Sequence, residues 1–240
     1  MGGHQGIVSY LSSMDEFDEI RVIPVFQHMF SSKRGKQASY DDRVAMCRLA
    51  FEGIPKVNIS QAEKECFDQH ARKSENYNKN PSSLRVGTAD LLDMLILQEP
   101  AVDFTLALGS DTFMDLTSFK WRRSRDILNL LNYRLLVFHR QSISYSTESE
   151  KSQYESFVND RIEEVNTMLF QGDEAEQCKS DFLTKNSTLF GARAIKVPEL
   201  SHISSTIIRS STNESILTES LHHSVYQYIK RNRLFAFADT

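Results

Sequence analysis

Residues 103–111 read DFTLALGSD, and this stretch decides the fold class of the 240-residue chain. The run over 103–108 is largely apolar and is typical of a strand, residues 109–111 predict a glycine turn, and a helical pattern follows. Residues 134–138 (RLLVF) repeat the strand pattern after a predicted helix over 127–131. Strands that alternate with helices indicate parallel crossover connections. We therefore predict an α/β fold with a doubly wound parallel sheet, in which ligands bind outside the carboxyl ends of the strands.

Further predicted elements lie on both sides of this unit. Ser39 is predicted to cap a helix with Asp42 at the capping-box position, and Thr88 to cap another helix whose leucines share one stripe. Residues 224–234 predict an amphipathic helix at the end of the sequence. The remaining predicted segments are strands over residues 19–25, 56–60 and 194–197 and a polar loop over residues 73–83.

The composition changes over residues 141–187, which are rich in Ser, Glu, Gln and Asn but still contain one predicted helix. We interpret this segment as a polar insertion, so that residues 1–240 form a single domain. A chain of this length has ample material for a hydrophobic core.

Charge excludes some classes of partner. Lys and Arg total 28 and Asp and Glu 32, which gives a net charge of −4. Such a chain has no global basic field, so we predict no binding to nucleic acid or to an anionic membrane, and any phosphate must be bound at a local site.

Cysteine and histidine usage indicates the compartment and argues against a metal site. The 3 cysteines are scattered and show no zinc-type spacing, and the histidines show no ligand spacing to one another. The apolar runs are too short to cross a bilayer, and the first residues do not resemble a signal peptide. We predict an intracellular, cytoplasmic protein, with the nucleus left open, and no protein-bound metal.

Residues 203–209 read ISSTIIR and are the most informative stretch for function. The hydroxyls of Ser204, Ser205 and Thr206 open a predicted helix after a strand, where free backbone N–H groups and hydroxyls make an anion site. Ser205 and Arg209 are four residues apart and can therefore bind the same phosphate from one helix face. The alternative is an ordinary helix cap with a solvated arginine; with the rest of the chain, we favour the phosphate site.

Other candidates are weaker when each is taken alone. Gly109 lets a ligand approach the backbone and Asp111 can accept from a ribose hydroxyl or an amide, although such a sequence is also a common turn. Lys33 lies in a Ser-rich loop where it can meet a polyphosphate or simply be solvated. Trp121, the only Trp, is a stacking platform or part of the core. His4 lies near glycines at a predicted helix start and can hydrogen-bond a phosphate, or it is incidental.

These pieces, in this order, resemble the nicotinate/nicotinamide mononucleotide adenylyltransferases of the nucleotidyltransferase superfamily. ISSTIIR is close to the family's I-S-S-T-x-I-R, and residues 108–121 are similar to I-G-x-D-x-x-x-x-L-x-x-W. Supporting segments are VIPVFQHMFSSKR at 22–34, the R-x-x-M that begins at residue 43, VGTADLL at 86–92, VFHR at 137–140 and VYQYIKRNRLF at 225–235. The resemblance implies a Rossmann-like fold of the nucleotidyltransferase type.

The resemblance also implies substrates and residue roles. The substrates would be ATP and a pyridine mononucleotide, with Mg²⁺ carried by the ATP phosphates and with direct attack of the mononucleotide phosphate on the α-phosphorus. His4 corresponds to the second histidine of the family's H-x-G-H signature and would stabilise the α-phosphate. The ATP phosphates would be bound by Ser204, Ser205, Thr206, Arg209 and Lys33, and the mononucleotide by Arg43, Thr88, Gly109, Asp111 and Trp121, with Trp121 stacked on the pyridine ring.

The sequence departs from the family's pattern ahead of His4, where the family has a first strand and the first signature residue. The loss of that central strand would leave two strands of the sheet without a neighbour. We therefore expect either an incomplete version of an active enzyme or a divergent member with impaired activity. Two alternatives stay open: nucleotidyl transfer to another phosphorylated acceptor, and a non-catalytic nucleotide-binding protein. The sequence does not decide between a monomer and a homo-oligomer.

Overall fold

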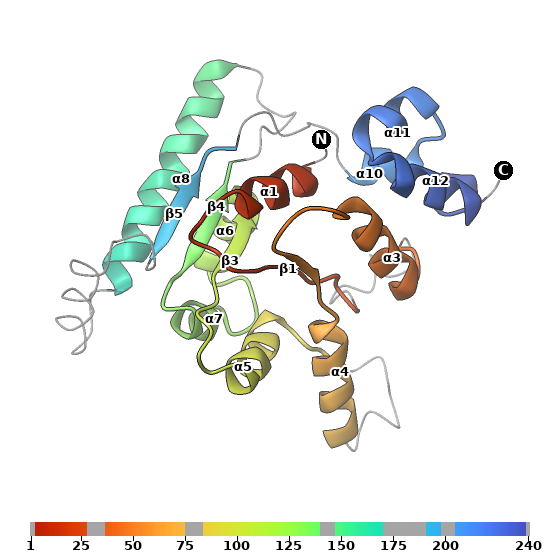
Figure 1. The fold of residues 1–240 in the computed structure, drawn as a ribbon. Coiled ribbons are helices and arrows are strands. Elements are labelled where there is room, and N and C mark those ends of the chain that lie inside the picture. The colour runs from red at the N-terminus through yellow and green to blue at the C-terminus, as the bar shows by residue number, and fades with distance from the viewer. Residues whose placement is uncertain are drawn as a thin grey trace. The chain divides into compact units, whose positions relative to one another are not determined.

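The structure is a computed structural model that describes residues 3–27, 37–74, 84–139, 147–169, 191–197 and 205–238. Two compact units make up the chain: residues 1–86 with 199–240 form the first, and residues 87–198 form the second. Figure 1 shows the order of the elements along the chain. Each unit contains a parallel sheet, as the alternation of strands and helices predicts.

The first unit contains the short pair β1 (Ile20–Val22) and β2 (Val57–Ile59), in which Ile20 is in register with Val57. Helix α1 (Gly3–Ser12) precedes β1 and buries the apolar side of its last turns, which the sequence supplies at positions 7, 8 and 11. Along the chain, helix α3 (Tyr40–Ala50) lies between β1 and β2, and helix α4 (Ala62–Lys73) follows β2. Sequence periodicity did not predict α4.

The cap of α3 confirms the sequence prediction at Ser39. Its hydroxyl oxygen accepts a hydrogen bond from the Asp42 amide at 3.0 Å and its O–H donates to the Asp42 carboxylate at 2.6 Å. This exchange satisfies a backbone donor that a helix start otherwise leaves unpaired. The same carboxylate accepts from the Tyr228 hydroxyl at 2.9 Å, which links α3 to the end of the chain.

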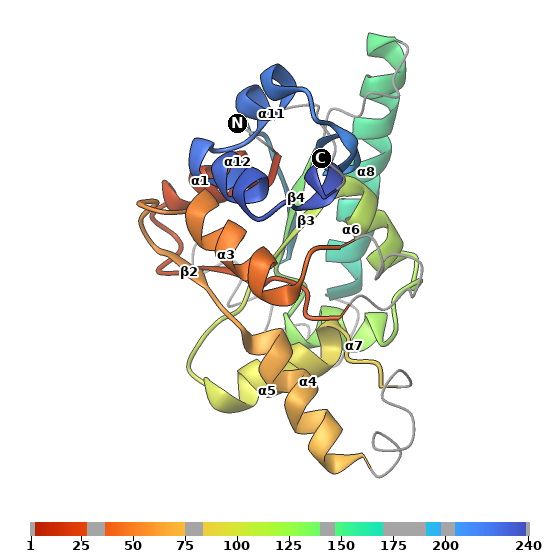
Figure 2. The same ribbon diagram turned by 90° about the vertical axis from the view of Figure 1, so that its right-hand side faces the viewer.

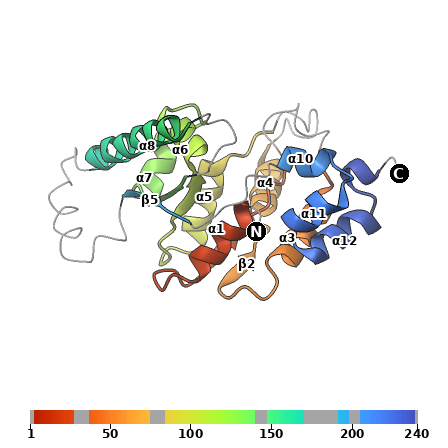
Figure 3. The same cartoon turned by 90° about the horizontal axis from the view of Figure 1, so that it is seen from above.

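That end of the chain is helical and packs against α3. It consists of α10 (Ser205–Ser210), α11 (Glu214–Ser220), α12 (His223–Arg231) and a 3₁₀ turn, η3 (Phe235–Phe237). Figure 3 shows α10, α11 and α12 gathered beside α3. Their shared core is formed by Leu217, Val225, Tyr226, Ile229 and Phe237, with Met46 and Leu49 of α3 against it.

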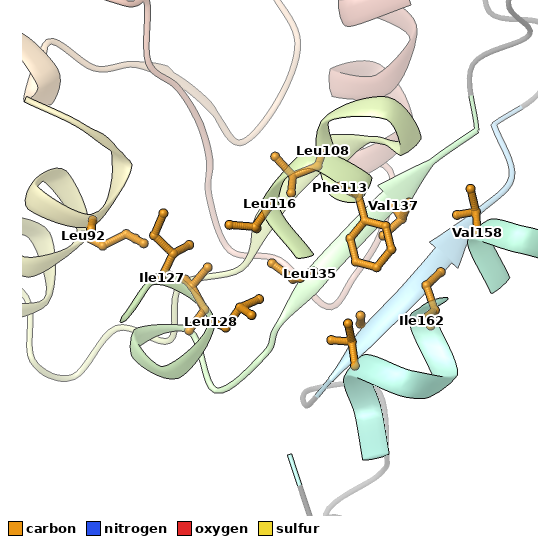
Figure 4. Packing of buried hydrophobic residues seen from close by; sticks show 14 residues of the cluster. Leu92, Leu108, Phe113, Leu116, Ile127, Leu128, Leu135, Val137, Val158 and Ile162 are labelled. Atoms are coloured by element: carbon orange, nitrogen blue, oxygen red, sulfur yellow. The ribbon is translucent and has the colours of Figure 1, made fainter. Parts of the chain in front are cut away.

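The second unit is built on a three-stranded parallel sheet in the order β3-β4-β5. Strand β4 (Leu135–Phe138) lies between β3 (Leu106–Gly109) and β5 (Ala192–Ile195), and all its residues are buried, as expected for a central parallel strand. Helices α5 (Thr88–Gln98), α6 (Ser110–Thr117), α7 (Ser124–Leu130) and α8 (Glu148–Leu169) complete the unit. Figure 4 shows the core that they enclose, with Phe113 and Val137 at its centre.

Helix α8 carries much of the segment that the sequence analysis interprets as a polar insertion. It runs beside β5 (Figures 1 and 2) and buries Val158, Ile162 and Val165 in the core of the second unit. Asn166 also forms two hydrogen bonds with the backbone of Ala192, at 2.7 and 2.9 Å, where β5 begins. This helix is therefore an integral part of the unit, while the assignment of the whole chain to one domain stays a prediction.

The α/β class and the parallel pairing are confirmed, and several boundaries differ from prediction. The first strand is only three residues long and ends ahead of Pro24, which cannot donate to a sheet ladder. Gly87, and not Thr88, caps α5, because the Asp90 carboxylate accepts from the Gly87 amide at 2.8 Å and Thr88 is the first helical residue. Of the predicted loop over 73–83, Lys73 is the last residue of α4 and residues 75–83 lie outside the described part.

Within the described residues the strands form two sheets and not one, with β1 paired only to β2 and β3 only to β4. No described helix combines the length and the apolar character that crossing a bilayer requires.

Candidate functional site

The predicted site residues fall in both units. Ser204 and Lys33 lie outside the described residues, as does the side chain of Ser205. The others in the first unit are His4, Arg43, Thr206 and Arg209, and those in the second unit are Thr88, Gly109, Asp111 and Trp121.

The chain that leaves β1 is bound by Arg43. From α3, the guanidinium donates to the carbonyl oxygen of Phe26 at 3.1 Å, to that of Val25, and to that of Ala38 at 3.2 Å. A single side chain therefore holds backbone on both sides of residues 28–36. The role that the family resemblance implies for Arg43, binding the mononucleotide, stays a prediction; in the structure its contacts are with backbone carbonyls.

The same backbone is bound from the other side by Glu63 of α4. Its carboxylate accepts from the Phe26 amide at 3.1 Å and from the Gln27 amide. Burial raises the pKa of Glu63 to about 7, although the Phe26 amide, the Arg43 charge and the Gln27 amide all favour the ionised form. A carboxyl group that titrates near neutral pH is typical of functional sites.

Aromatic rings complete the surroundings of Phe26. Its ring lies 5.0 Å from that of Tyr40, edge to face, and 5.1 Å from that of Phe67, measured between ring centroids. The Lys64 ammonium lies 5.7 Å from the centroid of the Phe26 ring. The Tyr40 hydroxyl is buried without a hydrogen-bond partner among the described residues. Its pKa is raised by burial and by the Glu63 charge.

His4 and the start of α10 are the other predicted sites of the first unit. His4 is exposed in the first turn of α1, and the next residue, Gln5, donates to the carbonyl oxygen of Ala50 at 3.0 Å. In α10, Thr206 is exposed and Arg209 is half-buried. The prediction that Ser205 and Arg209 belong to one helix is confirmed, since α10 spans both positions.

In the second unit, one buried carboxylate joins two predicted ligand-binding segments. Asp90, with 6% of its surface exposed, accepts from the Gly87 amide and from the guanidinium groups of Arg122 at 3.0 Å and Arg123 at 3.1 Å. Gly87 precedes Thr88, and Arg122 follows Trp121. The turn before α5 and the turn before α7 are therefore held together by charge-assisted hydrogen bonds.

Trp121 is half-buried and packs against the core of the second unit. Its carbonyl oxygen accepts from the Ser124 hydroxyl at 2.8 Å, which fixes the turn that carries it. Both interpretations left open by the sequence, core residue and stacking platform, are compatible with this partial burial.

Gly109 ends β3 and caps α6, and Asp111 is exposed in the first turn of that helix. Strand and helix meet here without an intervening turn, and the φ of Gly109, −68°, is one that any residue adopts. That Gly109 lets a ligand approach the backbone at the carboxyl end of this parallel strand stays a prediction.

Sequence reasoning missed Glu63 and Asp90. Asp90 had a local signal, because it lies three residues after the glycine that precedes the helix, which is the capping-box spacing. Glu63 had none: it is one of several charged residues in a polar helix, and its partners lie far away in the sequence.

The described part of the chain contains no group of three His, Cys, Asp or Glu side chains arranged to hold a metal ion.

The curated proteins similar to this chain all carry the same name. The probable nicotinate-nucleotide adenylyltransferase of Myxococcus xanthus is 28% identical over 120 residues, which cover 49% of this chain and 53% of that protein. Its counterpart in Hahella chejuensis is 27% identical over 224 residues, 92% of this chain and 83% of that protein. The chain spans about half the length of the first curated relatives that it matches. No family model matches the chain.

Solved structures agree at the level of the fold. The nicotinic acid mononucleotide adenylyltransferase of Plasmodium falciparum, in its complex with NaAD, superposes with a TM-score of 0.59 at 17% identity and covers 98% of this chain. The chain is thus similar in sequence to the nicotinate-nucleotide adenylyltransferases. Its fold is a Rossmann-like α/β fold similar to that of the Plasmodium enzyme.

Proposed function

We propose that this chain is a nicotinate/nicotinamide mononucleotide adenylyltransferase, which transfers the adenylyl group of ATP to a pyridine mononucleotide, with nicotinate mononucleotide as the preferred acceptor. The observation that carries the proposal is the agreement of two comparisons. The curated relatives are named as nicotinate-nucleotide adenylyltransferases, and the Plasmodium enzyme with the same fold over 98% of this chain was solved with NaAD bound.

In the proposed reaction, an oxygen of the mononucleotide phosphate attacks the α-phosphorus of ATP. A new P–O–P bond forms, the bond from the α-phosphorus to the bridging oxygen breaks, and pyrophosphate leaves with both electrons of that bond. Such a transfer needs positioning and charge stabilisation more than a nucleophilic side chain. Mg²⁺ would be bound by the ATP phosphates and would supply charge neutralisation there.

We base the proposed residue roles on the sequence motifs and on the elements that carry these residues. We propose that the exposed His4 stabilises the α-phosphate. Thr206 and Arg209 support a phosphate role because they share a helix whose first turn offers hydroxyl and N–H donors. The proposed ATP-phosphate residues are Ser204, Ser205, Thr206, Arg209 and Lys33, and the proposed mononucleotide residues are Arg43, Thr88, Gly109, Asp111 and Trp121.

The test is direct. The full chain is incubated with ATP and Mg²⁺ and with either nicotinate or nicotinamide mononucleotide, and pyrophosphate and dinucleotide are quantified. We expect both products in equal amounts, with a higher kcat/KM for the nicotinate form. A reaction without acceptor controls for ATP hydrolysis. No dinucleotide from either acceptor would contradict the proposal, and pyrophosphate release only with another phosphorylated acceptor would favour a different nucleotidyl transfer.

A further inference from the structure

Phe26 is held at both polar groups of its backbone by side chains of opposite charge. Glu63 of α4 accepts from its N–H at 3.1 Å, and Arg43 of α3 donates to its carbonyl oxygen at 3.1 Å. Two helices thus bind one residue of an irregular segment through a carboxyl group and a guanidinium group. Hydrogen bonds to the ionised forms of these groups are stronger than those between neutral groups.

The location of this pair matters because of the topology. Phe26 follows β1 by four residues, and ligands of parallel α/β sheets bind beyond the carboxyl ends of the strands. Irregular backbone at such an edge has no ladder to hold it in place. The conformation of residues 25–27 therefore depends on the side chains that bind it.

Binding this backbone with a carboxyl group has a cost in desolvation free energy. Glu63 is removed from water far enough that burial dominates its pKa, in spite of two amides and a guanidinium that favour its ionised form. A neutral side chain would hold the same two helices and the loop at a lower desolvation cost. An ionised group retained at this cost next to a ligand edge points to a role in the site.

We propose that Glu63 is a positioning residue, which together with Arg43 holds the backbone of residues 25–27 in the conformation that the nucleotide site requires. The proposal rests on the proposed adenylyl transfer. Glu63 does not touch the reacting atoms; it acts through the amides of Phe26 and Gln27. The ionised form accepts both N–H groups, whereas a protonated carboxyl group is a weaker acceptor, so the hold on this segment weakens as Glu63 takes up a proton.

The titratable and charged groups around Glu63 come from two helices. Arg43 and Tyr40 face it from α3, and both appear in the electrostatics of the site. On its own helix, Lys64 lies over the Phe26 ring and pairs with Asp68 at 2.7 Å, and Glu65 is exposed. Because Arg43 stays charged throughout the neutral range, Glu63 is the group of this pair whose protonation changes there.

The experiment uses the full chain and three variants. Glu63→Gln removes the charge at constant size, and Glu63→Asp keeps the charge but withdraws it by one methylene. Glu65→Gln is the matched control, because Glu65 is exposed two residues further along the same helix. Amide hydrogen exchange of residues 25–27 is measured between about pH 5.5 and pH 8.5 and expressed as protection factors, which removes the intrinsic pH dependence. In parallel, kcat/KM for ATP is measured over the same range.

In the wild type and in Glu65→Gln, we expect protection and kcat/KM to fall together as the pH decreases through about 7. In Glu63→Gln, both should be about tenfold lower at pH 8 and should lose this pH dependence, as expected when a hydrogen bond to a charged group is removed. In Glu63→Asp, residues 25–27 should be less protected than in the wild type, but their protection should still depend on pH. That result would attribute the effect to the charge and not to a loss of the fold.

Two outcomes would overturn the role of Glu63. One is unchanged protection of residues 25–27 in Glu63→Gln. The other is lost protection with a kcat/KM profile that keeps the wild-type shape. A wild-type chain that shows exchange behaviour as expected but no turnover with either mononucleotide would instead contradict the proposed function, because the exchange measurement needs no substrate.

Discussion

The carboxylate of Asp90 accepts hydrogen bonds from a single guanidinium nitrogen of Arg122, at 3.0 Å to one oxygen and 3.1 Å to the other. Arg123 donates to the first of these oxygens as well, at 3.1 Å, and the Gly87 amide donates to the second at 2.8 Å. A buried carboxylate with this many donors fixes the relative position of two turns, and breaking the set removes one acceptor from each guanidinium group and from the Gly87 amide.

Replacing Asp90 should therefore destabilise the second unit. We expect Asp90→Asn to lower the free energy of unfolding by about 2 kcal/mol, less than for a fully buried pair because both arginines are partly exposed. The control is Asp93→Asn, which removes an exposed partner of Arg123 and should cost less than about 0.5 kcal/mol. Urea unfolding of the two variants and the wild type gives the comparison. Equal losses in both variants would contradict the special position of Asp90.

Gly191 offers a second stability test, because its φ of +81° favours glycine and an added Cβ would lie 2.6 Å from the Asn166 side-chain oxygen. That oxygen accepts from the Ala192 amide, so it cannot move without losing the hydrogen bond that starts β5. We expect Gly191→Ala to lower the free energy of unfolding by about 2–4 kcal/mol, the sum of backbone strain and displaced Asn166.

Gly53 provides the matched control for this change. Its φ is also positive, +76°, but a Cβ there meets nothing within 4 Å. Gly53→Ala should cost only the backbone term, about 1 kcal/mol. Thermal or urea unfolding that ranks the two variants in the opposite order would show that Asn166 does not restrict the space beside Gly191.

Whether a feature can be predicted from the sequence depends on how far apart in the sequence the interacting residues lie. A strand followed by a helix and the Ser39 cap depend on residues within a few positions of one another, and the sequence predicts them. The strand predicted over 103–108 is found at Leu106–Gly109, and the glycine turn predicted over 109–111 is replaced by the direct start of α6. Glu63 and Asp90 act through partners 37 and 32 residues away, Phe26 and Arg122. No local pattern marks such pairs, because they exist only once the crossovers have formed.

The predicted site shows the same division. ISSTIIR places Ser205 and Arg209 on one helix because a four-residue spacing is a local property. The contacts of Arg43 with the carbonyls of Phe26 and Ala38 are not visible in its motif. The motif marks a position in the fold, and the structure shows which groups that position contacts.

Glu63 should also change how stability depends on pH. Its pKa is about 7 in the folded chain and 4.5 in its ordinary state. Between these values the folded chain holds more protons on this residue than the unfolded chain does, so its contribution to stability falls as the pH rises. Glu63→Gln cannot ionise and should gain about 1–2 kcal/mol of stability relative to wild type between about pH 5 and pH 8.

Urea unfolding at several pH values measures this difference. Glu65→Gln, exposed on the same helix, should show a difference from wild type that is independent of pH. A constant difference for Glu63→Gln would mean that Glu63 titrates equally in the folded and unfolded chains. If the activity profile proposed above is also found, ionised Glu63 lowers the free energy of unfolding in the same pH range in which it supports activity.

Arg209 tests the proposed phosphate site. We expect Arg209→Ala to raise the KM for ATP about tenfold with little change in the KM for the mononucleotide, since a charge-assisted hydrogen bond to a phosphate is lost. Arg48→Ala removes an equal charge from an exposed position in the last turn of α3 and serves as the control. Steady-state kinetics with each substrate varied in turn separates the two constants. An equal rise in both constants would indicate a structural effect of Arg209.

Trp121 can report on the proposed mononucleotide site through its fluorescence, because it is the only tryptophan of the chain. It is half-buried, it packs against the core of the second unit, and its turn is fixed by the Ser124 hydrogen bond at 2.8 Å. If a pyridine ring stacks on it, nicotinate mononucleotide should quench the intrinsic fluorescence in a saturable titration, and ATP alone should not. Trp121→Phe should abolish the signal and raise the KM for the mononucleotide about tenfold, the scale of one base-to-ring stacking contact. Binding of the mononucleotide in a thermal-shift titration without any change in fluorescence would show that Trp121 belongs to the core alone.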